Sequence, residues 1–175
     1  MIRLYWLFLF LVPFLTAWEE FRSETGRFRV VAPQKMQHKI DSTNTAVGDL
    51  IYHTYYTQGR MNQIYMITYC DYPEGSIHAD STDLVEDFFD VTIASAAESV
   101  AGEILYIQKE KLQKVYRGKR WRIDYMDGAA IIRTRAFLIG NRYYSVQVVS
   151  SRENSVNSET QRFMNSFRIL EATSP

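Results

Sequence analysis

The feature that most constrains the fold is a run of four extended segments joined by tight turns in the C-terminal half of the chain. The segments span residues 104–112, 119–125, 130–139 and 143–150. Asp127-Gly128, between the second and third segments, is a strong signal for a two-residue hairpin turn. Strands joined by so short a turn pair in antiparallel directions. This half of the chain therefore predicts an antiparallel sheet.

The remaining segments add three strands and two helices. Strands are predicted at residues 26–33, 47–56 and 64–72. Two stretches without Gly or Pro predict amphipathic helices at 81–100 and 157–167. The expected fold class is α+β, with a largely antiparallel sheet of about six to seven strands and two packed helices.

The first predicted helix has a sheet-facing side and an acidic side. The positions expected to pack on the sheet are Leu84, Phe88, Val91 and Ser95, flanked by Val85, Phe89 and Ala96. The acidic residues on the other side are Asp83, Glu86, Asp87, Asp90 and Glu98. Such a stripe is typical of a solvated helix face, and the alternative is a docking surface for a basic partner.

The N-terminus has the order of a secretory signal peptide. Arg3 precedes an apolar run from Leu4 to Leu15, and Thr16-Ala17 supplies a small residue before the cut. The run is shorter than the roughly 20 residues that a membrane-spanning helix needs. We expect a signal peptide at 1–17 and a secreted or periplasmic, cell-envelope location, with an uncleaved membrane anchor as the alternative.

Composition indicates one globular domain over residues 18–175. Without residues 1–17 the chain keeps 19 basic and 20 acidic residues, a net charge of −1. This balance argues against a nucleic-acid partner, which would require a basic patch or stripe. Cys70 is the single cysteine, so no intrachain disulfide forms.

Several segments resemble the PsbP/Mog1-like superfamily. The resemblance lies in the strand Phe28–Pro33, the helix at 81–100, the Arg-Tyr-Tyr-Ser-Val step at 142–146 and the closing Phe163-Met-Asn-Ser-Phe167. It implies an α+β sandwich without a shared catalytic site. Related folds include a photosystem accessory protein, a nuclear transport factor and bacterial envelope lipoproteins. The envelope or secreted branch fits the predicted export, although this chain lacks an acylated cysteine.

Four arginines are predicted to share one face of the Asp127-Gly128 hairpin. The turn sets Arg122 opposite Arg133, and Arg120 opposite Arg135. Directly opposed like charges destabilise a sheet, so these side chains need water, carboxylates or a bound anion. A solvated face is one interpretation, and a site for an anionic ligand or an acidic partner is the other.

The turn before the last strand decides the register of that strand. A two-residue turn at Gly140-Asn141 would place Val146 and Val148 on the arginine face, whereas a three-residue turn keeps both in the opposite, apolar core. Because burial of apolar side chains specifies register strongly, we expect the three-residue turn.

Other candidate residues are aromatic, thiol and imidazole side chains. Tyr55, Tyr65 and Tyr69 indicate either core aromatics or an aromatic ligand groove. Cys70 and His53 lie on strands that can be neighbours, which would be needed for a cysteine hydrolase. The three histidines, at 38, 53 and 78, lack metal-site spacing, so we expect no metal and no cofactor.

These observations predict an exported, non-enzymatic binding or accessory module of the cell envelope, with an unknown envelope protein as partner. The alternatives are a carrier for a small anionic ligand, held by arginines in an aromatic groove, and a cysteine hydrolase. A membrane association is expected only if the N-terminal segment is retained.

The export prediction is tested by the mass of the native protein. Protein purified gently from its own host and weighed intact should begin at Trp18, because the signal segment is removed at Ala17. A mass that retains Met1 would contradict cleavage and favour the anchored alternative.

Overall fold

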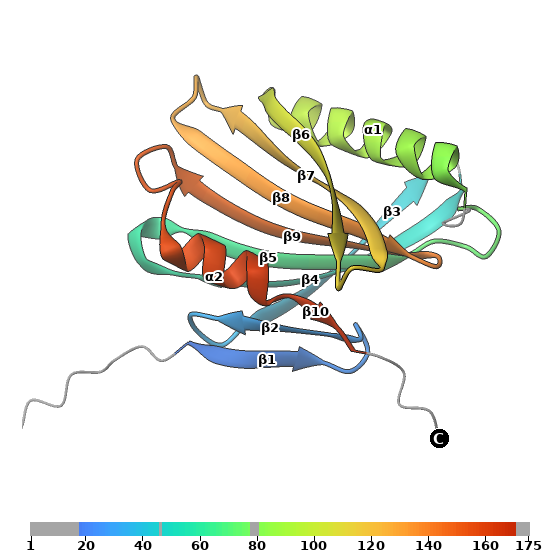
Figure 1. Ribbon diagram of the computed structural model, residues 1–175, viewed down its shortest axis with the longest axis horizontal. Coiled ribbons are helices and arrows are strands. Elements are labelled where there is room, and N and C mark those ends of the chain that lie inside the picture. Colours follow the sequence, from blue (N-terminus) through green and yellow to red (C-terminus); the bar gives the residue numbers. More distant parts are fainter. Residues whose placement is uncertain (1–17, 46, 78–80, 171–175) are drawn as a thin grey trace, which may run out of the picture.

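A computed structural model describes residues 18–45, 47–77 and 81–170. The predicted signal segment 1–17 and His78 lie outside these residues. Seven strands form one antiparallel sheet and three shorter strands form a second (Figure 1). The large sheet runs, in spatial order, through β3 (Gln37–Thr45), β4 (Gly48–Gln58), β5 (Ile64–Asp71), β9 (Arg142–Ser151), β8 (Ala130–Ile139), β7 (Tyr116–Tyr125) and β6 (Glu103–Leu112). The small sheet contains β1 (Glu19–Ser23), β2 (Phe28–Ala32) and β10 (Arg168–Ile169).

The helices lie on opposite faces of the large sheet. α1 (Thr82–Ser99) covers one face, and α2 (Ser158–Ser166) covers the other together with the small sheet (Figure 1). A short 3-10 helix, η1 (Arg60–Asn62), joins β4 to β5. The predicted α+β class is confirmed.

Three strands have no clear signal in the sequence. Eight of the nine β3 residues are exposed, so β3 shows no alternation of buried and solvated positions. β1 reads Glu-Glu-Phe-Arg-Ser, and β10 contains two residues that pair with β2. Such strands form because a neighbouring strand offers hydrogen-bonding groups, which a local pattern does not reveal.

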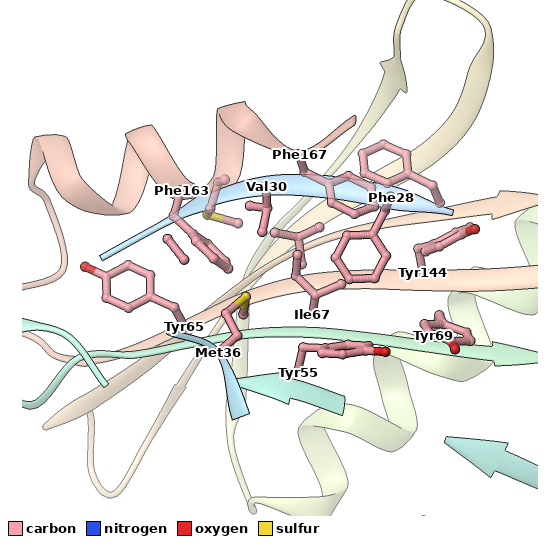
Figure 2. Close-up of a cluster of buried hydrophobic side chains, with 14 of the residues drawn as sticks. Phe28, Val30, Met36, Tyr55, Tyr65, Ile67, Tyr69, Tyr144, Phe163 and Phe167 are labelled. Carbon is pink, nitrogen blue, oxygen red and sulfur yellow. The ribbon is translucent and has the colours of Figure 1, made fainter. Parts of the chain in front are cut away.

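The large sheet separates two hydrophobic cores. Under α2 and the small sheet, aromatic rings from both layers interlock, and Phe28, Tyr65, Phe163 and Phe167 are fully buried (Figure 2). The Asn157 side chain caps α2 by accepting a hydrogen bond from the Thr160 backbone N–H at 2.7 Å.

The rotation of α1 differs from the sequence expectation. The side chains buried under α1 are Val85, Phe89, Ile93 and Ala97. Leu84 is 49% exposed and Val91 is 67% exposed, so the expectation is wrong at these two positions, whereas Phe88 and the flanking Val85, Phe89 and Ala96 pack in the core as expected. Lys119 lies beneath this helix with its side chain buried, and its ammonium pairs with Glu86 at 2.9 Å and Asp90 at 2.5 Å. Part of the acidic stripe therefore faces the sheet, because an unpaired buried ammonium would be costly.

The turn between β8 and β9 also corrects an expectation. Ile139 pairs with Arg142, so Gly140-Asn141 is a two-residue turn. Val146 and Val148 therefore lie opposite Arg135 and Arg133, on the arginine face. Both valines are nevertheless buried, because α2 and the small sheet cover this part of that face. The expectation of a three-residue turn assumes that only one face of the sheet packs against a hydrophobic core.

Phe167 tests how α2 closes the second core. Its buried ring contacts Phe28, Phe137 and Tyr144. Phe167→Ala should lower the free energy of unfolding by about 3–5 kcal/mol, measured by guanidinium denaturation, because it leaves a cavity. The control Val156→Ala removes a side chain that is 73% exposed and should change stability little. Equal losses in the two variants would contradict this placement.

Candidate functional site

The β7–β8 hairpin places the four arginines as its turn chemistry predicts. Arg120 pairs with Arg135 and Arg122 with Arg133, on one face of the large sheet. Met126, Asp127 and Gly128 all adopt positive φ in the turn. The predicted arginine pairing is confirmed, and the electrostatic environments of its members differ.

Two of these arginines are neutralised by carboxylates. Arg122 donates two hydrogen bonds to Asp124, at 2.5 and 2.8 Å, and Arg152 approaches the same carboxylate at 3.1 Å. The hydrogen bond from Arg122 lowers the pKa of Asp124, which keeps this carboxylate ionised. Arg135 pairs with Glu110 at 2.8 Å, and both side chains are largely buried. Arg122 and Arg135 therefore have local structural partners.

Arg120 and Arg133 have no carboxylate partner within the part of the chain that the structure describes. The Arg120 Nε donates to the neutral amide oxygen of Gln108 at 2.8 Å. The Arg133 Nε is buried, and none of the described residues accepts a hydrogen bond from it. Buried polar groups in proteins are nearly always satisfied, so this donor marks an incomplete environment.

A cavity lies beside these two arginines. It has a volume of about 250 Å³ and is lined by Arg120, Arg133, the β6 residue Tyr106 and the α2 residues Gln161 and Asn165, among others. Nothing in the sequence marks the α2 side chains as site residues, because only tertiary packing brings that helix next to β7 and β8. The cavity wall also includes the paired Glu110 and Arg135, and it offers several hydrogen-bond donors around Arg120 and Arg133. We call Arg120, Arg133 and this cavity the arginine site.

The three candidate tyrosines do not form an open groove. Tyr55, Tyr65 and Tyr69 are buried in the core beneath α2 and the small sheet (Figure 2). Burial raises the pKa of Tyr65 to about 12, and its hydroxyl donates to the Gln63 side chain at 2.7 Å. The aromatic-groove hypothesis is therefore wrong for these residues, which pack as core aromatics with their hydroxyls hydrogen-bonded or at the margin.

The cysteine hydrolase hypothesis fails on the strand register. Tyr52 pairs with Cys70, and His53 pairs with Tyr69. Because side chains alternate along a strand, Cys70 and His53 point to opposite faces of the sheet. Cys70 is fully buried under α1, and burial raises the pKa of its thiol to about 12. These two residues do not form a nucleophile–base pair.

Among the described residues, no group of three or more His, Cys, Asp or Glu side chains is placed to hold a metal ion. None of the described helices has the length and apolar character needed to cross a membrane.

Comparison with known proteins supports the fold. No family model and no curated protein matches the sequence. The solution structure of cyanobacterial PsbP (CyanoP) from Synechocystis sp. PCC 6803 matches with a TM-score of 0.59, covering 89% of this chain and 94% of that chain. The two sequences are 8% identical, so the likeness concerns the fold alone. The expected PsbP/Mog1-like fold is confirmed.

Burial of Cys70 predicts an unreactive thiol. At pH 8 the native protein should react with iodoacetamide far more slowly than the urea-denatured protein, because the thiolate is the nucleophile and burial suppresses it. Stability should also fall as pH rises from about 9 toward 12, since the unfolded thiol ionises before the folded one. Equal native and denatured alkylation rates, measured by mass spectrometry, would contradict the buried state.

Proposed function

We propose that this chain is an exported, non-enzymatic accessory module of the cell envelope that binds an acidic group of a protein partner at the arginine site. The observation that carries the proposal is that Arg120 and Arg133, which have no carboxylate partner among the described residues, line one cavity. Residues 1–17 support the export part of the proposal through their signal-like order.

A carboxylate is the group that best complements this site. A guanidinium presents a planar fork of donors that matches two carboxylate oxygens, and charge-assisted bonds of this kind are stronger than neutral ones. Arg120 and Arg133 each lie directly across from another arginine. An anion in the cavity would reduce the repulsion between these pairs.

The size of the cavity favours a chemical group over a whole ligand. Pockets for drug-sized molecules usually have volumes of about 300–1,000 Å³. The arginine site, at about 250 Å³, lies below that range and fits one acidic side chain or chain terminus. This size supports a macromolecular partner in preference to a small ligand. The carrier hypothesis also needs an aromatic groove, and the three candidate tyrosines are core residues instead.

A binding role also agrees with the chemistry of the cavity wall. The carboxylate on that wall, Glu110, is held by Arg135 at 2.8 Å. Catalysis of proton transfer would need a base positioned on a substrate, and this carboxylate is already engaged in an ion pair. Fold likeness adds nothing here, because one fold serves many functions.

Charge reversal tests the proposal. Arg133→Glu or Arg120→Glu should weaken binding of a fluorescein-labelled hexaglutamate peptide by at least about tenfold in anisotropy titrations, because each removes a positive charge and introduces repulsion. Arg133→Lys keeps the charge without the fork and should give an intermediate loss. Arg60→Glu is the matched control, since Arg60 is exposed on η1 and the change in net charge is the same.

Two results would go against the proposal. Equal weakening by Arg133→Glu and Arg60→Glu would mean that net charge alone attracts the peptide. Saturable binding of inorganic phosphate at the arginine site, without peptide binding, would favour the small-anion carrier instead.

A further inference from the structure

Two histidines lie side by side at the other edge of the large sheet. His38 on β3 and His53 on β4 point to the same face, and the His38 Nε2 lies 3.2 Å from the His53 Nδ1. His38 is exposed and His53 is partly exposed. We call these two residues the histidine pair. Two strands, β5 and β9, separate it from β8, and it shares no residue with the arginine site.

Each ring of the histidine pair stacks on a tyrosine ring. The His38 ring stacks on Tyr55, with centroids 4.2 Å apart and planes 4° from parallel. The His53 ring stacks on Tyr69, with centroids 4.7 Å apart and planes 5° from parallel. Both tyrosines are buried, and the Tyr55 hydroxyl accepts a hydrogen bond from Ser23 at 3.2 Å. The planes of the two imidazoles are 14° from parallel, and their centroids are 5.4 Å apart.

The two facing nitrogens lie within hydrogen-bond distance, and two neutral imidazoles satisfy this contact when one donates its N–H to the other. If both facing nitrogens carried protons, the N–H groups would repel each other, and if neither did, two lone pairs would face each other. A shared proton satisfies the pair as one hydrogen bond. A metal ion bound at about 2.05 Å from each nitrogen would see them at an angle of roughly 100°, close to tetrahedral.

We propose that His38 and His53 form a two-imidazole site for a divalent cation of the Zn²⁺ and Cu²⁺ class. Imidazole nitrogens suit these ions, whereas Mg²⁺ and Ca²⁺ prefer oxygen ligands. The histidine pair supplies two ligands, and the solvent-exposed side leaves the remaining positions to water or to a donor from another molecule. This site differs from the sequence expectation of no metal, because histidines 15 residues apart meet only through the pairing of β3 with β4.

Charged groups on the neighbouring strands surround the histidine pair. Burial lowers the pKa of His53, and so does the neighbouring His38. Asp71 on β5 acts in the opposite direction, and Arg142 on β9 lowers this pKa further.

Titration calorimetry of the untagged mature chain with ZnCl₂ tests the proposal. We expect one Zn²⁺ per chain and no binding of MgCl₂ under the same conditions. His38→Ala and His53→Ala should each weaken Zn²⁺ binding by at least about tenfold, since one imidazole remains. His78→Ala, which removes the third histidine of the chain, should leave the affinity unchanged and is the matched control.

A second measurement avoids reliance on variants that alter folding. In ¹⁵N spectra of the histidine rings, Zn²⁺ should shift the His38 Nε2 and the His53 Nδ1 resonances together. Absence of Zn²⁺ binding, or binding that survives both substitutions and leaves these resonances unmoved, would overturn the proposal.

Discussion

The central strands of the large sheet are buried on both faces. Each face therefore needs a covering layer, and the helices and the small sheet supply these layers. On one face Phe89 and Ile93 of α1 pack in a core with Trp121. On the other face, Phe163 and Phe167 pack in a core with the small sheet. Burial of two faces gives a domain of this size enough apolar contact to fold without a disulfide. It also explains why Lys119, caught beneath α1, needs two carboxylates.

The cover on the second face is incomplete, and this creates both proposed sites. One row of paired residues crosses that face: Gln108, Arg120, Arg135, Val146, Ile67, Tyr55 and His38. Its middle residues are buried beneath α2 and the small sheet, whereas the two ends carry polar side chains at the margins of that cover. Along this one row, the face carries arginines at one end, buried core residues in the middle and an imidazole at the other end. Sites at such margins combine a rigid apolar support with access to solvent.

The likeness to cyanobacterial PsbP at 8% identity concerns the same layered packing. Packing of this kind depends on where apolar side chains lie, which many sequences satisfy. The arginine site and the histidine pair depend instead on individual side chains. The function of this protein therefore depends on such side chains, because a fold alone is compatible with many activities.

Local chemistry allowed the sequence by itself to determine the α+β class, both helices and the pairing of Arg122 with Arg133, since Asp127-Gly128 dictates a register between adjacent strands. Only the tertiary structure decided which side of α1 is buried, where Val146 points and why Cys70 and His53 lie on opposite faces. It also decided which arginines lack a carboxylate and which histidines meet. These properties depend on contacts between segments distant in the chain, where burial of both sheet faces outweighs any local pattern.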